Sequence, residues 1–407
     1  MTRAPDLVSL AEALRSRLPA DALSFDPDPR YAVDGLRPAF VAAPATPEDV
    51  GATLAAANDA GAAVIPFGGG TQMHLGMPPE RYDLALDLRR LDRVIEYEPA
   101  DLTVTVEAGV RLAELQRVLA QHGQWLPLDP PLPAAATIGG VLATNASGPA
   151  RHRYGTARDL LIGIRVATAA GELVKAGGRV VKNVAGYDMG KLHIGALGTL
   201  GVIVQASFKV APLPAQTAIA AVAGPLTALM SITSRLIDAR LPLDALVLTK
   251  DASEPDWRLR VCFAGGEAAV QRSQRELAAI APDAAVGATL AVALDAPLVV
   301  RASVLPTTNA SICEALAALG AGVVAYPTVG IVYGVWTDAP PADALVDLRR
   351  RCVEAHGALV IERARSEQKR AVGVWGPTRA DFGLMRRLKE ELDPRRVLNP
   401  GRYLGGI

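Results

Sequence analysis

The chain has 407 residues, of which 50% are hydrophobic and 21% are charged, and its 42 Lys and Arg residues balance its 42 Asp and Glu residues. A chain of this length and apolar content buries the cores of roughly two to three domains, which excludes intrinsic disorder. The zero net charge argues against non-specific nucleic-acid binding and against a polybasic membrane anchor, because both need a local excess of Lys and Arg.

The cysteines are few and scattered. Cys262, Cys313 and Cys352 form no Cys-x-x-Cys pair. They therefore predict neither a disulfide framework nor a four-cysteine metal or iron–sulfur site, and they favour a reducing compartment such as the cytoplasm. Asp6 and Glu12 interrupt the stretch where a signal peptide needs an apolar run, and we expect no secretory signal and no transmembrane segment.

The first part of the chain predicts a helix within residues 1–36 and then a strand–helix–strand unit over residues 37–66. Thr46 is a typical N-cap for the helix of this unit, and Gly61 marks its end. The second strand runs directly into Phe67-Gly68-Gly69-Gly70-Thr71. The sequence therefore predicts a strand that leads into a glycine loop.

Residues 82–110 alternate between polar and apolar and predict a meander of strands at 84–88, 94–98 and 103–107. A helix over residues 111–122 follows. A second segment rich in small residues, 137–148, is expected at the start of a short helix. Further strands are predicted at 161–168, 173–176 and 202–210, and they enclose a third glycine-bearing stretch, 195–201.

After the Pro-rich residues 212–214, Ala-rich helices alternate with strands such as 243–249, 257–264 and 323–336, and a helix around 382–392 precedes the end of the chain. The change in composition predicts a domain boundary near residue 215. We therefore divide the chain into 1–36, 37–215, 216–380 and 381–407.

The three glycine segments together indicate an anion site. Glycine lets the backbone turn at positive φ and approach a ligand closely, so that several N–H groups can converge on one diphosphate. A single triplet such as Gly68–Gly70 is equally well explained as a tight turn. The segment 137–148 adds hydroxyl and amide side chains, from Thr137, Thr144, Asn145 and Ser147.

The spacing of these glycines excludes two common nucleotide-binding loops. Neither Gly68–Gly70 nor Gly195-x-x-Gly198-x-x-Gly201 has the Gly-x-Gly-x-x-Gly pattern of a Rossmann fold. Residues 186–192 lack both the spacing of a Walker A loop and its magnesium-binding hydroxyl. We therefore exclude a Rossmann dehydrogenase and a P-loop kinase.

The motifs taken together resemble the PCMH-type FAD-binding domain of the vanillyl-alcohol oxidase superfamily. They are Pro66–Gln72, Thr137–Gly148, Lys182–Asp188, Gly198–Ile203 and Leu398–Gly401. Within this superfamily the chain is most similar to the FAD-binding E subunit of bacterial glycolate oxidase. The resemblance implies an α+β fold, with a two-subdomain FAD-binding domain at 37–215, an antiparallel-sheet α+β cap domain at 216–380, and a C-terminal segment that returns to the FAD domain.

The resemblance also implies which residues contact FAD. They are Pro66, Phe67, Gly68, Gly69, Gly70, Thr71, Gln72, Thr137, Gly139, Gly140, Asn145, Ser147, Gly148, Tyr154, Gly155, Gly198, Gly201 and Ile203. Ile203 and its neighbours are expected at the adenine end. A histidine in the first loop commonly holds the flavin covalently in this superfamily, and Thr71 stands at the matching position. We therefore expect non-covalent FAD, with His74 and His152 as outside candidates for attachment.

The sequence departs from the related D-2-hydroxy-acid enzymes in the cap domain. Those enzymes carry a His-x-Gly-Asp-Gly-Asn motif and a Glu-His-Gly segment that hold a metal and the substrate, whereas Tyr326–Tyr333 contains no histidine. We therefore expect no metal site and assign no catalytic residue. Lys182, Tyr187, Lys191 and Arg365 are candidate contacts for a substrate carboxylate or hydroxyl.

Three functions follow from these expectations. The first is an FAD subunit of a glycolate oxidase-type complex, which acts on a small 2-hydroxy acid beside a catalytic flavoprotein subunit and an iron–sulfur subunit. Such a complex is expected in the cytoplasm or on the inner membrane through its partners. The second is a self-sufficient FAD oxidoreductase, and the third is a scaffold subunit with a vestigial flavin site.

Overall fold

The computed structural model describes residues 4–178, 187–290, 292 and 294–407. These residues form two compact units. The first unit contains residues up to Ser147, then Thr156–Pro212 and Pro377–Ile407, and the second contains Gly148–Gly155 and Leu213–Gly376. Lys182–Gly186 of the predicted motif at 182–188 lie outside the described residues.

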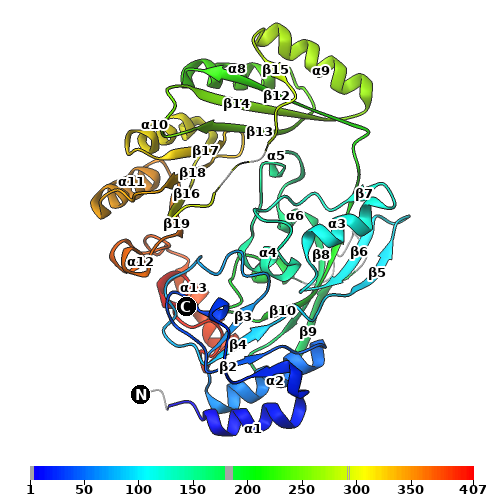
Figure 1. The fold of residues 1–407 in the computed structure, drawn as a ribbon, viewed down its shortest axis with the longest axis vertical. Coiled ribbons are helices and arrows are strands. Elements are labelled where there is room, and N and C mark those ends of the chain that lie inside the picture. Colours follow the sequence, from blue (N-terminus) through cyan, green and yellow to red (C-terminus); the bar gives the residue numbers. More distant parts are fainter. Residues whose placement is uncertain (1–3, 179–186, 291, 293) are drawn as a thin grey trace. The chain divides into compact units, whose positions relative to one another are not determined.

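The first unit begins with a small mixed sheet of four strands in the order β1-β2-β4-β3 (Figure 1). Its strands are β1 (Leu23–Ser24), β2 (Phe40–Ala42), β3 (Val64–Phe67) and β4 (Leu84–Asp87). Helix α2 (Pro47–Ala60) connects β2 to β3. It starts and ends as predicted, because the Thr46 hydroxyl accepts a hydrogen bond from the Asp49 amide and Gly61 adopts φ = 66°.

One strand prediction was wrong. β4 is not part of an antiparallel meander but pairs in parallel with both β2 and β3. All four of its residues are buried, which suits a central strand that is covered on both faces. The apparent alternation of Leu84, Ala85, Leu86 and Asp87 therefore did not mark a solvent-facing side.

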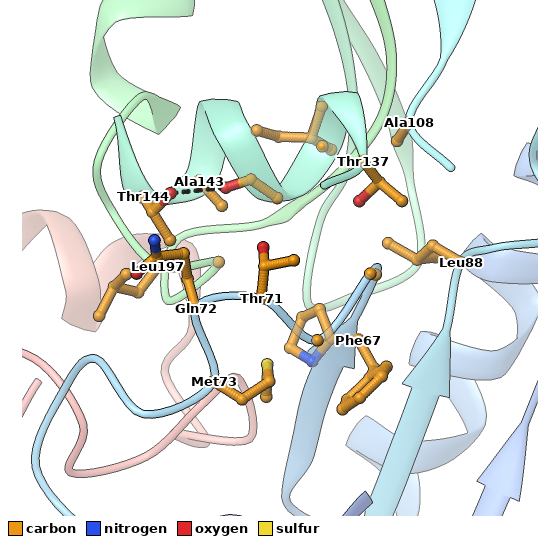
Figure 2. A pocket seen from close by; sticks show the side chains of 18 of the residues that line it. Phe67, Thr71, Gln72, Met73, Leu88, Ala108, Thr137, Ala143, Thr144 and Leu197 are labelled. Atoms are coloured by element: carbon orange, nitrogen blue, oxygen red, sulfur yellow. Dashed lines mark hydrogen bonds between the residues drawn. The ribbon is translucent and has the colours of Figure 1, made fainter. Parts of the chain in front are cut away.

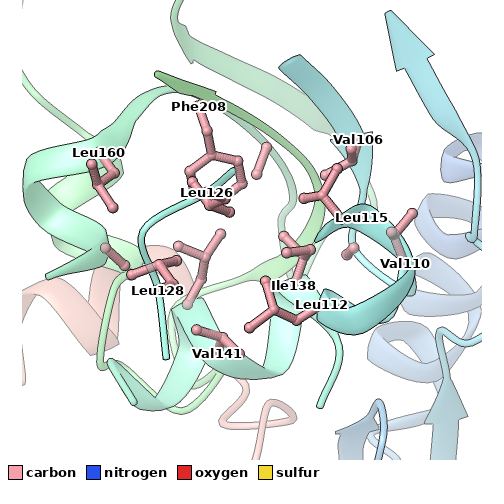
Figure 3. Packing of buried hydrophobic residues seen from close by; sticks show 14 of the residues in the cluster. Val106, Val110, Leu112, Leu115, Leu126, Leu128, Ile138, Val141, Leu160 and Phe208 are labelled. Atoms are coloured by element: carbon pink, nitrogen blue, oxygen red, sulfur yellow. The ribbon is translucent and has the colours of Figure 1, made fainter. Parts of the chain in front are cut away.

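The second sheet of this unit is antiparallel, in the order β5-β6-β10-β8-β9. Its strands are β5 (Val94–Glu98), β6 (Thr103–Glu107), β8 (Leu161–Ala167), β9 (Leu173–Gly177) and β10 (Val202–Lys209). Helices α3 (Leu112–Ala120), α4 (Ile138–Thr144) and α6 (Ala157–Leu160) contribute side chains to its core. Figure 3 shows Leu112, Leu115 and Ile138 packed together with Phe208 in this core.

The two ends of the chain join the first sheet. Helix α1 (Leu7–Arg17) buries Leu10 and Leu14 in the same core as Leu54 of α2. After helix α13 (Phe382–Leu392), Leu398 forms a parallel bridge with Val64 beside β3. The remaining short elements of the unit are η1 (Ala20–Ala22), η2 (Pro29–Tyr31), β7 (Gln124–Trp125), α7 (Gly190–His193), β11 (Ala211–Pro212) and η4 (Leu404–Gly406).

The second unit is built on an antiparallel sheet of eight strands in the order β15-β12-β14-β13-β17-β18-β16-β19. The strands are β12 (Gln216–Gly224), β13 (Leu243–Lys250), β14 (Trp257–Gly265), β15 (Ala285–Val286), β16 (Leu298–Ser303), β17 (Gly322–Tyr326), β18 (Ile331–Trp336) and β19 (Ala358–Arg363). The helices are α5 (Arg151–Tyr154), α8 (Leu226–Asp238), α9 (Glu267–Ile280), η3 (Pro306–Thr308), α10 (Asn309–Ala318), α11 (Ala342–Glu354) and α12 (Ser366–Val372).

The predicted strand at 323–336 is a hairpin of β17 and β18 rather than one strand. Its turn contains Gly330 at φ = 70°, a conformation that favours glycine. Separate sheets and helices in both units confirm the predicted α+β class. None of the helices in the described ranges is long and apolar enough to cross a membrane.

Candidate functional site

The three glycine segments of the first unit meet at one cavity with an empty volume of about 760 Å³, open solvent at its mouth included. The loop after β3, helix α4 and the turn before β10 form its walls (Figure 2). The predicted cofactor contacts that line it are Pro66, Phe67, Gly68, Gly69, Gly70, Thr71, Gln72, Thr137, Gly139, Gly140, Gly198 and Ile203.

Two of these glycines differ in what a side chain at their position would meet. A Cβ atom on Gly69 would lie 1.8 Å from the carbonyl oxygen of Ala135, so the first loop and the segment before α4 touch through their backbones. A Cβ atom on Gly140 would meet only the Thr137 hydroxyl, at 3.2 Å. Gly69 is therefore needed for packing, whereas Gly140 leaves space open beside α4.

The cavity lining contains buried polar atoms of Thr137 and Asn399 that have no hydrogen-bond partner among the residues that the structure describes. Thr137 is the N-cap residue of α4, but its hydroxyl makes no capping bond, and the side chain is 2% exposed. The hydroxyl oxygen of Thr137 and the amide oxygen Oδ1 of Asn399 are both buried and unpaired. An unpaired buried group costs about 1–3 kcal/mol, so both atoms indicate a polar ligand.

The C-terminal segment contributes a charge to the same cavity. Arg402 is 3% exposed and donates from Nη2 to the carbonyl oxygens of Met73 and Leu75. Burial lowers the pKa of Arg402 to about 10, against the opposing effect of Asp34 and Tyr82, and the guanidinium therefore stays protonated at neutral pH. The cavity thus has a buried cation in its wall.

The rest of the lining was not among the expected FAD contacts, although Thr144 was noted as a polar side chain of the second glycine segment and Val202 is a neighbour of Ile203. The remaining lining residues are Met73, Leu75, Leu88, Ala108, Ala143, Thr144, Leu197, Val202, Asn399 and Arg402. Figure 2 shows Leu88 and Leu197 at different sides of the space between the first loop and α4. The apolar members carry no signal that separates them from core residues. Asn399 had one, because it belongs to the Leu398–Gly401 motif.

Several predicted contacts in the first unit lie elsewhere. Asn145, Ser147 and Gly201 do not line this cavity. Asn145 ends α4 in the left-handed conformation, with φ = 51°. A Cβ atom on Gly201 would come within 2.6 Å of the Val166 side chain, so glycine is required there by packing. Both residues thus have structural reasons for their identity.

Gly148, Tyr154 and Gly155 belong to the second unit. Burial raises the pKa of the Asp244 carboxyl, although hydrogen bonds from Tyr154 and Arg153 oppose that shift. Arg153 also donates to the carbonyl oxygen of Ala264 at 2.7 Å. Within this unit, residues 148–155 are therefore anchored to β13 and β14.

The described candidates for substrate contacts are exposed side chains. Lys182 lies outside the described residues. Tyr187 is 94% exposed, Lys191 pairs with Asp188 at 2.9 Å on the surface, and Arg365 is exposed in the second unit. Tyr187 and Lys191 do not line the cavity of the first unit. No catalytic residue is assigned from these positions.

The histidines considered for covalent attachment lie in different units, and the cysteines that could bind a metal are buried. His74 belongs to the first unit and is not among the residues that line its cavity, and His152 belongs to the second unit, where burial lowers its pKa. Cys262, Cys313 and Cys352 are free and buried. In the part of the chain that the structure describes, no group of three His, Cys, Asp or Glu residues is arranged to hold a metal ion.

Comparison with known proteins identifies the region around this cavity. Residues 38–177 match the family described as FAD binding domain. Glycolate oxidase subunit GlcE of Escherichia coli is 41% identical over 130 residues, which is 32% of this chain and 37% of that protein. Glycolate oxidase subunit GlcD of Bacillus subtilis is 32% identical over 191 residues, or 47% of this chain and 40% of that protein.

A D-2-hydroxyglutarate dehydrogenase of Xanthomonas citri pv. viticola is 35% identical over 217 residues, which is 52% of this chain and 45% of that protein. The chain thus spans less than half the length of each of these curated relatives. A solved structure of alkyldihydroxyacetonephosphate synthase matches 96% of this chain and 84% of its own, with a TM-score of 0.73 and 18% identity. This likeness confirms the fold.

Proposed function

We propose that this chain, whose residues 38–177 form an FAD binding domain, holds FAD non-covalently in the cavity of the first unit and serves as the FAD-binding subunit of a 2-hydroxy-acid oxidoreductase complex. The observation that carries the proposal is the meeting of three glycine segments at one cavity whose lining includes the buried Thr137 hydroxyl and Asn399 Oδ1, both unpaired among the described residues. When bound, FAD supplies a ring that accepts a hydride from carbon.

The residues of the cavity fit the parts of FAD. Backbone N–H groups of the loop Gly68–Gln72 suit the diphosphate, and the Thr137 hydroxyl can donate a further hydrogen bond to it. The Arg402 guanidinium complements the negative charge. Apolar side chains such as Leu88 and Val202 suit the aromatic rings of the cofactor.

The residue types of the lining support non-covalent attachment. A covalent flavin bond needs a nucleophilic side chain such as His, Cys or Tyr. Among the described residues that line the cavity, none is of these types, and Thr71 occupies the loop position where the superfamily commonly has histidine. The bound FAD is therefore expected to leave the protein on denaturation.

The substrate class and the partners rest on the relatives. Glycolate, D-lactate and D-2-hydroxyglutarate, in the names of the relatives, are all 2-hydroxy acids. Two of the relatives are named as subunits of glycolate oxidase. We infer that this chain works beside a catalytic flavoprotein subunit and an iron–sulfur subunit that takes the electrons, in the cytoplasm or on the inner membrane through these partners.

Two measurements test the proposal. An absorbance spectrum of the purified chain, recorded before and after acid precipitation, is expected to show flavin that is released into the supernatant. A colourless protein that takes up no added FAD but still assembles with its partners would favour a scaffold instead. Under anaerobic conditions, glycolate or D-lactate is expected to bleach the flavin only when the catalytic subunit is present, and bleaching of the chain alone would favour a self-sufficient oxidoreductase.

A further inference from the structure

The C-terminal helix α13 carries a lysine that is buried in the first unit. The side chain of Lys389 is 3% exposed. Its ammonium donates to the Asp393 carboxylate at 2.7 Å, to the Thr199 carbonyl at 2.9 Å and to the Leu398 carbonyl at 2.8 Å. An ammonium has three protons, so all its donors are used.

Asp393 completes the same cluster. It is fully buried, and its carboxylate accepts the backbone N–H groups of Val397 at 3.0 Å and Leu398 at 2.8 Å. Burial lowers the pKa of Lys389, although the Asp393 charge opposes that shift. Apolar residues of similar volume commonly give a fold as stable as a buried ion pair does, so the feature to explain is which segments the hydrogen bonds of this pair connect.

The cluster connects two walls of the FAD cavity. Thr199 follows Gly198 in the third glycine turn, and Leu398 precedes Asn399 in the C-terminal segment. Asn399 makes a second connection, because its Nδ2 donates to the Leu197 carbonyl at 2.6 Å. This bond fixes the orientation of the amide, whose buried Oδ1 is an acceptor without a partner among the described residues.

The chemistry of that acceptor restricts what it can meet. A diphosphate has no proton to donate at neutral pH, whereas the ribityl and ribose hydroxyls, the adenine amino group and the flavin N3–H are donors. Asn399 Oδ1 therefore suits a hydroxyl or N–H of the cofactor, and the Thr137 hydroxyl suits the phosphates. Asn399 Oδ1 and the Thr137 hydroxyl are thus suited to different parts of FAD.

We propose that Lys389 is a positioning residue for FAD, which holds the turn 197–201 against the C-terminal segment so that Asn399 Oδ1 accepts a hydrogen bond from a hydroxyl or N–H of the cofactor. The inference rests on the proposed function, since it concerns the same cavity. It extends the FAD site beyond residues 38–177, to side chains near the C-terminus.

The test compares Lys389→Met and Asn399→Ala with the wild-type chain after the flavin has been removed. Arg386→Met is the matched control, because Arg386 pairs with Glu390 at the same i,i+4 spacing on the same helix, but on the surface and at 3.9 Å. The dissociation constant for FAD is measured by quenching of flavin fluorescence, the melting temperature is measured without FAD, and the visible circular dichroism of bound flavin is recorded at saturation.

Both variants are expected to weaken FAD binding by about tenfold or more, since each loses or misplaces one hydrogen bond to the cofactor, while Arg386→Met stays within about twofold. The flavin circular dichroism of Lys389→Met is expected to change. A lower melting temperature with unchanged FAD affinity would show a structural role only and would overturn the inference.

If Lys389→Met does not fold, Asn399→Ala decides, because it leaves the Lys389 cluster complete. Wild-type FAD affinity in that variant would overturn the inference while the proposed function stands. A wild-type chain that binds no FAD would overturn both.

Discussion

Replacement of Thr137 by valine tests the cofactor site at a single atom. Valine keeps the branched shape of threonine and exchanges the hydroxyl for a methyl group. The backbone of Thr137, at φ = −95° and ψ = 153°, is extended and accepts either residue. The hydroxyl caps no helix and has no partner within the described ranges of the chain, so Thr137→Val removes no hydrogen bond seen in the fold.

The expected effects on stability and on binding have opposite signs. Without FAD, loss of a buried unpaired hydroxyl removes a desolvation cost of about 1–3 kcal/mol, so the free energy of unfolding is expected to stay equal or to rise. With FAD, the variant loses a hydrogen bond to a charged phosphate, which contributes about 1.5–3 kcal/mol. At 1.4 kcal/mol for each factor of ten, FAD affinity is expected to fall by about 10- to 100-fold.

The assay is an FAD titration followed by flavin fluorescence, together with urea denaturation of the flavin-free protein. Thr144→Val is the matched control: Thr144 lines the same cavity, but its hydroxyl donates to the Gly140 carbonyl at 2.8 Å. This control is expected to keep FAD affinity within about threefold. The reasoning is refuted if both variants bind FAD equally well, or if Thr137→Val destabilises the flavin-free protein by more than about 1 kcal/mol.

Three further substitutions test the packing at Gly69, the open space beside Gly140 and the charge on His193. Gly69→Ala is expected to destabilise the flavin-free protein by about 2 kcal/mol or more in urea, because its Cβ would lie 1.8 Å from the Ala135 carbonyl oxygen. Gly140→Ala should keep or raise the melting temperature, since alanine favours a helix by about 1 kcal/mol, yet weaken FAD binding by filling the cavity; unchanged binding would contradict this. Burial lowers the pKa of His193 from 6.5 to about 4, so its contribution to stability is present above pH 6.5 and is lost as the pH falls through 4. Urea denaturation between those pH values should show a loss of about 3 kcal/mol that His193→Gln removes, and an equal loss in both proteins would count against this assignment.

The glycine segments could be predicted from the sequence because backbone geometry restricts the residue type there. No other residue fits where the Gly69 Cα faces the Ala135 carbonyl, and Gly70 adopts φ = 74°. The same reasoning placed Asn145 and Gly201 among the predicted contacts, although the structure explains them by a helix end and by packing. A glycine or asparagine thus marks a constrained backbone, but the pattern alone does not say what constrains it.

The buried cations could not be predicted in the same way. Lys389 and Arg402 stand among other charged residues, which are mostly exposed in proteins, and nothing nearby in the sequence marks them as buried. Lys389 reaches a carbonyl oxygen 190 residues away, at Thr199. Such a contact depends on the fold of the whole unit and cannot be predicted from the local sequence pattern.

The residues inside and outside the matched range 38–177 contribute different chemical groups to the site. Inside residues 38–177 lie the glycine loop and α4, which provide backbone donors and one hydroxyl. Outside that range lie Leu197, Asn399 and Arg402, which provide an apolar wall, an amide acceptor and a charge. The first set suits a diphosphate, and Arg402 of the second set adds a positive charge for it, whereas the donors on the sugar and ring parts of FAD need an acceptor such as Asn399. We therefore expect the selection of FAD over other diphosphates to depend on segments beyond residues 38–177, which the hydrogen bonds of the buried Lys389 connect to one another.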